Sequence, residues 1–138
     1  MEARLLLLAD YASLEQGTGK LNIIGAFNRI FAQEFPAAHA MMYLVVRIGA
    51  ELGEFNLERH LEVVLFDEDG QEKWRTPSLP FTIPTPPSGK TGEFNAVIGL
   101  QMMVFDKAGR YEFRVYVDHD QRGVIPLDLE LVQPKPQG

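Results

Sequence analysis

Two polar turns rich in carboxylates contain the residues with the clearest capacity for chemistry. Asp67, Glu68 and Asp69 stand in one turn, and Asp118 and Asp120 stand in another. Calcium takes about six to eight oxygen ligands, and carboxylates from several loops can supply them where the loops converge. If consecutive strands alternate in direction, however, the two turns lie at opposite ends of the molecule. We therefore expect solvated carboxylates here rather than a calcium site.

The chain has three histidines and no cysteine that could bind a transition metal. His60 is flanked by Glu58 and Glu62, which places three potential ligands on one strand face. Residues two apart on a strand are separated by about 6.5 Å, too far for a compact chelate, so a solvated outer face is the better interpretation. The absence of cysteine excludes disulfides, thiolate zinc sites and iron–sulfur clusters.

Nucleophilic and phosphate-binding motifs are missing. The three serines, Ser13, Ser78 and Ser88, do not occur in the Gly-x-Ser-x-Gly motif of hydrolases. Gly89 to Thr91 resembles the end of a phosphate-binding loop, but the position of the loop's first glycine is Pro84, which has no backbone N–H. We identify no catalytic, cofactor-binding or metal-binding residue. A carboxylate pair of the glycosidase type stays open, because any two acidic residues can meet in space.

Length and composition indicate one soluble globular domain. The chain has 138 residues, of which 46% are hydrophobic and 23% are charged. The 13 basic and 19 acidic residues give a net charge of −6, which repels phosphate backbones and anionic membranes. We see no basic patch, so we expect neither a nucleic-acid partner nor a membrane partner. The apolar run from Leu5 to Ala9 is too short for a signal sequence, and together with the missing cysteines it predicts a cytoplasmic protein.

Alternating hydrophobicity predicts strands along most of the chain. The clearest is Arg110 to Asp118, where every second side chain is apolar. Similar patterns predict strands over 20–27, 40–48, 57–65, 94–104 and 125–131, separated by turns that contain glycine. On the strand at 94–104, we expect Phe94, Ala96, Ile98, Leu100, Met102 and Val104 to share one face.

This spacing predicts an all-β protein with a single antiparallel β-sandwich of about seven to eight strands over residues 1–133, immunoglobulin-like or C2-like in general architecture. Five of the nine prolines fall between residues 76 and 92, which predicts a long proline-rich loop there. Residues 134–138 are expected to form a disordered tail.

Two segments are less clear in type. Leu5 to Leu14 is rich in leucine and alanine, which favours a helix, but both of its faces are apolar, as in a buried strand. The turn at 17–20 that leads into the next predicted strand favours the strand. The best helix candidate elsewhere is Asn28 to Phe35, which Pro36 would end.

Four sequence motifs connect the chain with a known family. They are Leu5-Leu-Leu-Leu-Ala-Asp-Tyr-Ala12, Gly19-Lys-Leu-Asn-Ile-Ile-Gly25, Leu65-Phe-Asp-Glu-Asp-Gly70 and Gly109-Arg-Tyr-Glu-Phe-Arg-Val115. Together they resemble a family of small, uncharacterised bacterial proteins that carry a domain of unknown function. The resemblance implies a bacterial all-β domain and a strand for the first segment. It implies no catalytic residue, because the motifs specify turns and strand starts.

The second face of two strands is apolar where a solvated strand would be polar. The residues concerned are Met41, Tyr43 and Val45 on one strand and Val97, Met103 and Phe105 on another. Either loops cover this surface, the proline-rich loop among them, or it is an interface for a protein partner or a second copy.

The sequence therefore predicts a non-catalytic binding or structural module that self-associates, as a homodimer for example, or binds a protein partner. The alternative is a hydrolase or carbohydrate-binding domain that uses acidic loop residues at one end of the sandwich.

Overall fold

The structure is a computed structural model that describes residues 1–87, 89 and 91–133. The predicted tail at 134–138 lies outside these residues, as do Ser88 and Lys90 of the predicted proline-rich loop. The described part contains ten strands and no helix, which confirms the all-β prediction. Accordingly, no helix in this part is long and apolar enough to cross a membrane.

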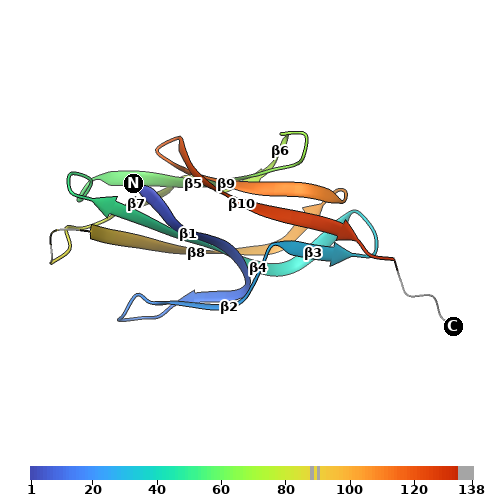
Figure 1. Cartoon of the computed structure of the whole chain (residues 1–138), viewed down its shortest axis with the longest axis horizontal. Coiled ribbons are helices and arrows are strands. Elements are labelled where there is room, and N and C mark those ends of the chain that lie inside the picture. The colour runs from blue at the N-terminus through green and yellow to red at the C-terminus, as the bar shows by residue number, and fades with distance from the viewer. Residues whose placement is uncertain (88, 90, 134–138) are drawn as a thin grey trace.

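The strands form two sheets, which Figure 1 shows as stacked layers. Sheet A has the order β2-β1-β4-β8 and consists of β1 (Glu2–Leu14), β2 (Leu21–Phe27), β4 (Ala37–Glu51) and β8 (Thr91–Phe105). Sheet B has the order β3-β10-β9-β5-β6 and consists of β3 (Arg29–Ala32), β10 (Asp120–Leu131), β9 (Gly109–Val117), β5 (Glu58–Phe66) and β6 (Glu72–Arg75). The short strand β7 (Leu79–Thr82) also pairs with β5.

One hydrophobic core lies between the sheets. Alternate side chains of β4, such as Leu44 and Val46, share it with Phe113 and Val115 of β9, and none of the four is exposed. Removing such side chains from water is worth about 1.5–3 kcal/mol each, which is the main force that holds the layers together.

The ten strands exceed the seven to eight that the spacing predicts. The immunoglobulin-like or C2-like arrangement stays a prediction.

The two ambiguous segments are both strands. The leucine-rich segment is β1, as its following turn indicates. The helix candidate at 28–35 is wrong: its centre is β3, which pairs in parallel with Asp128 to Leu131 of β10. Backbone hydrogen bonds to a strand about 100 residues away replace the local helical ones, and a sequence pattern cannot reveal such a partner.

The β1–β2 hairpin folds back over the outer face of sheet A. β1 pairs with β4 as far as Ala9 and afterwards with β2 alone. At the tip of the hairpin, the Gly19 carbonyl accepts a hydrogen bond of 3.4 Å from Asn95 of β8, although β4 lies between β1 and β8 within the sheet. Figure 1 shows β2 at the bottom of the view, below β1, β4 and β8. Gly25 permits the fold, because it has a φ of 70° and a Cβ there would lie 2.5 Å from the Asp10 carboxylate.

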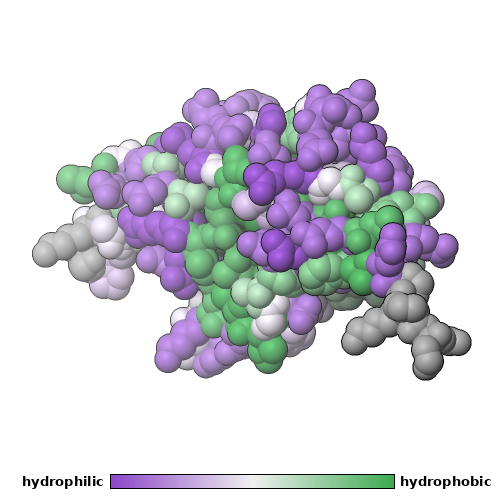
Figure 2. Space-filling view, turned by 45° about the vertical axis from the view of Figure 1, so that its right-hand side comes forward, coloured by the Kyte–Doolittle hydropathy of each residue, from purple (hydrophilic) through white to green (hydrophobic). Residues whose placement is uncertain are grey.

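On one side of the molecule the two sheets approach closely. We call this the seam, and define it as residues 2–7 of β1 and 120–127 of β10. A Cβ on Gly123 would lie 2.3 Å from Leu6 Cδ1, so a larger residue there would require the end of the Leu6 side chain to move. A shallow groove of about 350 Å³ runs beside it, lined by Leu6 to Leu8, Phe27 and Pro126 among others. Figure 2 shows a hydrophobic stripe on this side of the molecule.

Candidate binding site

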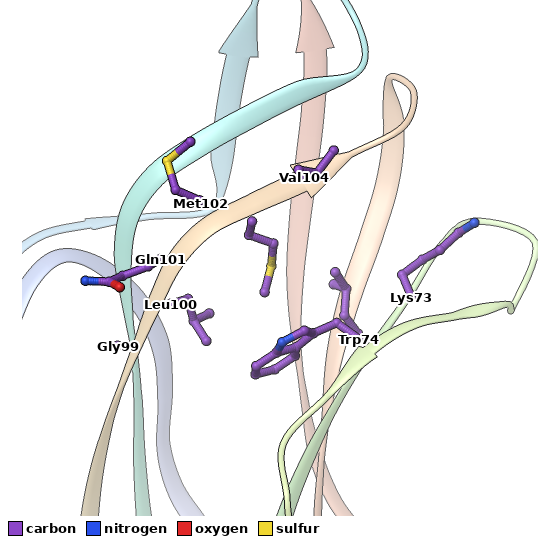
Figure 3. Close-up of a pocket in the computed structure, with 9 residues that line it drawn as sticks. Lys73, Trp74, Gly99, Leu100, Gln101, Met102 and Val104 are labelled. Atoms are coloured by element: carbon purple, nitrogen blue, oxygen red, sulfur yellow. The ribbon is translucent and has the colours of Figure 1, made fainter.

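A pocket of about 330 Å³ lies at the opposite side, where the edges of the two sheets stand apart. We call it the edge pocket; it is lined by Leu65, Lys73, Trp74 and residues 99–104 of β8. Trp74, the single tryptophan of the chain, lies opposite Leu65 in the β5–β6 ladder and packs edge-on against Phe113, with ring centroids 6.1 Å apart. Figure 3 shows the indole of Trp74 reaching toward β8. The pocket is therefore built on a ring that the core holds in place.

The β8 wall of the pocket depends on a distortion at Met102. This residue has a φ of 49°, in the left-handed region that a non-glycine residue seldom adopts. The alternation of side chains changes there: Met102 and Val104 are 61% and 56% exposed, while Met103 and Phe105 enter the core. The expectation that Met102 and Val104 share a face with Phe94 to Leu100 is therefore wrong beyond Leu100. The change of face turns two methionines toward opposite sides of the strand at the pocket.

The positive charge of Lys73 is paired with carboxylates at the rim of the edge pocket. Lys73 is the only charged residue of the lining, and its amine lies 3.6 Å from an oxygen of Asp67 and 3.5 Å from one of Asp106. Figure 3 shows this side chain directed away from Trp74. The lining contains no carboxylate and no histidine. The pocket thus presents aromatic, thioether and aliphatic groups, which suit an apolar side chain of a ligand.

Two of the six predicted interface residues belong to the core. Met103 and Phe105 are 8% and 1% exposed, and the Phe105 ring packs edge-on against Tyr111 at 5.1 Å between centroids. Their placement on the second face is wrong, because it assumed that strict alternation continues through Met102. A single left-handed residue is enough to exchange the two faces of the strand.

The other four residues do lie together on the outer face of sheet A. In the β4–β8 ladder, Tyr43 is opposite Gly99 and Val45 is opposite Val97, with Met41 next to them. Val45 is nonetheless fully buried within the chain, beneath the region that the hairpin crosses. The proposed cover is therefore present in part, and it is the β1–β2 hairpin rather than the proline-rich loop. Its contact with the face includes the edge-on pair of Tyr11 and Tyr43, 5.5 Å apart.

Met41, Tyr43 and Val97 remain half-buried, toward the free edge of β8. The side chains of Met41 and Tyr43 lean over Gly99, where a Cβ would lie 3.0 Å from Met41 Cε. These three residues flank the strand that forms the wall of the edge pocket. The structure thus brings half of the predicted interface next to a site that the sequence did not reveal.

The acidic turns are occupied by interactions of their own. Asp67 accepts hydrogen bonds of 2.9 Å from the backbone amides of Asp69 and Gln71, and these bonds, that of Gln71 first, lower its pKa despite the opposing effect of burial. The Asp69 carboxylate lies 3.2 Å from the Lys107 amine. Because β8 and β9 are joined at 106–109, this places the Asp67 turn beside the Asp106 turn, as strand alternation predicts.

Asp118 lies in the turn that joins β9 to β10 and binds two groups of β5. It accepts hydrogen bonds of 3.1 Å from Arg59 and 2.9 Å from the His60 amide. Burial alone raises the pKa of Asp118, but these bonds outweigh it and hold the pKa below its usual value. This carboxylate stabilises a turn and is not free to act on a ligand.

The histidines do not form a metal centre. His60 faces Asp118 at 3.7 Å, whereas His119 faces Glu62 at 3.6 Å, each as a single pair. Among residues 1–87, 89 and 91–133, no group of three or more histidine, aspartate or glutamate side chains is placed to hold a metal ion. The outer face of β5 is a network of charge pairs.

Sequence reasoning missed Trp74 and Met102. Trp74 lies in a four-residue strand after the Asp67 turn. Because it is the single tryptophan of the chain and lies beside a hairpin turn, it could have been singled out as a candidate binding residue. Met102 could not have been found in this way, because the sequence of an apolar strand does not indicate which of its residues has a left-handed backbone conformation.

Comparison with known sequences identifies a family. The sequence profile described as "Family of unknown function (DUF6941)" matches residues 4–130, nearly the whole described chain. The chain belongs to this family. This agrees with the resemblance to a domain of unknown function, while the bacterial origin is not part of the match. No curated protein matches the sequence.

Comparison with solved structures finds a shared fold. One similar structure is the alkylpurine DNA glycosylase AlkC of Pseudomonas fluorescens, bound to DNA that contains an abasic site analog. The TM-score is 0.52 and the identity 10%, and the match covers 94% of this chain but only 30% of that chain. At this identity the likeness shows the fold alone. It still corrects one prediction: the exclusion of nucleic-acid partners was wrong, since this DUF6941 member shares its fold with part of a protein solved on DNA.

Proposed function

We propose that this DUF6941 protein is a non-catalytic binding module that holds a protein partner at the edge pocket. The observation that carries the proposal is the pocket itself: the only tryptophan of the chain, anchored on Phe113, lies across an opening between two sheet edges from residues 99–104 of β8. Tryptophan and methionine are enriched where proteins contact partners, and an anchored aromatic ring gives such a contact its energy. The half-buried Met41, Tyr43 and Val97 extend the surface along β8.

The alternative, a hydrolase or carbohydrate-binding domain at the acidic end, has less support. The Asp67 carboxylate accepts hydrogen bonds from backbone amides, the Asp69 carboxylate is paired with Lys107, and the Asp118 carboxylate is paired with Arg59. A general acid or base needs a carboxyl group whose pKa is raised toward neutrality, whereas the pKa values of Asp67 and Asp118 are lowered. These side chains are better suited to holding turns than to proton transfer.

A second candidate function is contact with nucleic acid, which the DNA-bound glycosylase brings into consideration. Arginines lie on the outer face of sheet B, including Arg110 and Arg114, but their guanidinium groups lie 3.1 Å and 2.6 Å from carboxylates of Asp128 and Glu112. A phosphate would have to displace these carboxylates. Binding of labelled single- and double-stranded DNA that weakens steeply with added salt would favour this function.

The cytoplasmic location and the bacterial origin stay predictions.

The test of the protein-binding function uses site-specific photocrosslinking. A photoreactive phenylalanine derivative replaces Met102 at the edge pocket or, as a matched control, Val124, which is exposed near the seam. We expect a discrete protein adduct in host extract from position 102 and not from position 124. The adduct is identified, the protein is purified, and its binding to the unmodified chain is followed by the emission of Trp74. A purified partner that leaves this emission unchanged, or equal adducts at both positions, would contradict the proposal.

A further inference from the structure

The free edge of β8 lies directly beside the edge pocket, which residues 99–104 of this strand help to form. We infer that the partner contributes an extended segment that adds to β8 as a further strand of sheet A and places one apolar side chain in the edge pocket. The inference rests on the proposed function and names the kind of partner and its mode of binding.

The backbone of β8 offers hydrogen-bonding groups along one side. The strand has 15 residues and is the last strand of sheet A, paired with β4 alone. From Asn95 to Phe105 it contains no charged residue and no proline. Native proteins commonly block an exposed edge with a charge, a proline or a very short strand. This stretch of β8 has none of these features.

Most of the other described strand edges carry such protection. β2, the other edge strand of sheet A, has no charged residue and no proline, but it is only seven residues long and Gly25, with a φ of 70°, interrupts its extended backbone. β6, β7 and β3 have four residues each, and β7 includes Pro80. The free part of β10 at the seam contains Pro126, which has no N–H to donate to an added strand. Among the strands that the structure describes, the long unprotected edge is that of β8.

The distortion at Met102 determines where along β8 an added strand would end. An added strand can follow β8 from Asn95 to Gln101, where the ladder with β4 is regular. At Met102, which has a φ of 49°, one pair is missing from this ladder before it resumes at Met103, and the edge pocket opens here between Leu100 and Trp74. A segment of about six to seven residues therefore reaches the pocket with one side chain at its end.

Charge indicates the composition of the segment. Three acidic residues of the 67–69 turn and Asp106 lie at the pocket end, together with the amines of Lys73 and Lys107; four negative and two positive charges give −2. At the opposite end, Glu93 is paired with both Arg4 and Arg47. We therefore expect an uncharged, apolar segment that carries a lysine or arginine directly after the side chain in the pocket.

The experiment selects peptides from a random display library on the immobilised full chain. Affinities of the labelled peptides are measured by fluorescence anisotropy, and the emission of Trp74 reports whether the pocket is filled. We expect selected peptides to be apolar with a basic residue near one end. Methylating alternate backbone nitrogens of a selected peptide, in each of the two registers, should weaken binding about tenfold or more in one register and little in the other, because only one set of N–H groups faces β8.

A matched pair of variants locates the site on the protein. Gln101→Lys places a charge on the exposed edge of β8, and Gln121→Lys places the same charge on the exposed end of β10. We expect about tenfold weaker peptide binding for the first variant and no change for the second.

The outcomes separate the two proposals. Peptides that fill the pocket but tolerate methylation in both registers would overturn strand addition and leave the binding function intact. A library that yields no peptide responsive at Trp74 would overturn both. Light scattering of the free chain supplies a further outcome: a stable dimer that Gln101→Lys dissociates would show that a second copy, and not a foreign segment, occupies β8. Unchanged affinity for Gln101→Lys would place the peptide elsewhere.

Discussion

The two long sides of this molecule, where the edges of sheets A and B meet, are built differently. At the seam, the end of the Leu6 side chain of β1 occupies the space that a Cβ on Gly123 of β10 would take, and Pro126 interrupts the free edge of β10. On the other side, β8 and β6 stand apart around a pocket that contains Trp74. A fold of two open sheets has exposed edges that must be managed. This protein packs its sheet edges together on one side, beside a groove of about 350 Å³, and keeps them apart on the other, where we propose that the partner binds.

The largest effect is expected from closing space at the seam. Gly123→Ala places a methyl group 2.3 Å from Leu6 Cδ1 and 3.6 Å from Ala3 Cβ, so the Leu6 side chain or the two strands must shift. We expect a loss of about 2–3 kcal/mol in the free energy of unfolding, measured in urea. Gly99→Ala at the open side meets only the flexible end of Met41, at 3.0 Å, and is expected to cost less than about 1 kcal/mol. Equal losses would show that the seam is no tighter than the β8 edge.

The next effect concerns the hairpin that covers sheet A. Tyr43→Ala removes the edge-on contact with Tyr11 and opens a path for water to Val45, which is fully buried. The expected cost is about 2 kcal/mol, from lost apolar burial and the lost aromatic pair. Val97→Ala, on the same face and half-buried, serves as a comparison and should cost about 1 kcal/mol. If Tyr43→Ala is neutral while it dissociates an oligomer, Tyr43 belongs to an interface between chains and not to packing within one chain.

The third effect is a weakening of stability in acid. The pKa values of Asp67 and Asp118 are lowered in the folded chain, so their contribution is present above their unfolded values, near pH 4, and disappears as the pH falls through the folded values. We expect the melting temperature to drop below about pH 4. Asp118→Asn removes the ion pair with Arg59 and should make the melting temperature depend less steeply on pH. Asp67→Asn should also make this dependence less steep, although its amide oxygen can still accept the hydrogen bonds from the backbone. An unchanged slope in both variants would assign the acid sensitivity to other carboxylates.

The smallest effect on stability is expected at the exposed β8 edge. Met102→Lys and Val104→Lys change side chains that are 61% and 56% exposed, so the free energy of unfolding should stay within about 0.5 kcal/mol of the unmodified chain. Both variants should nevertheless lose binding of the selected peptides, because a charge at the pocket mouth is desolvated by an apolar ligand. A large loss of stability would mean that Met102 supports the fold and not a ligand.

Local pattern was enough to predict much of the fold. Alternation placed β9 to within one residue and β10 to its last residue, although β10 begins at Asp120 and not at Ile125. The Asp67 to Gly70 sequence marked a turn in which Gly70 has a φ of 79°. Turn positions also predicted that the Asp67 and Asp106 turns share one end. These features follow from the two-residue period of a strand and from the few residues that tolerate turn geometry, and both are properties of the chain itself.

The sequence by itself determined an all-β, cysteine-free domain of a family without assigned function, with strands where alternation and turn residues place them. Only the tertiary structure decided that residues 29–32 are a strand on β10, that the hairpin covers Val45, and that Met103 and Phe105 face the core. It also decided the edge pocket, which joins Trp74 to a strand some thirty residues later. The reason is physical: periodicity records which faces one strand can bury, whereas strand partners and distortions such as that at Met102 depend on contacts between distant segments.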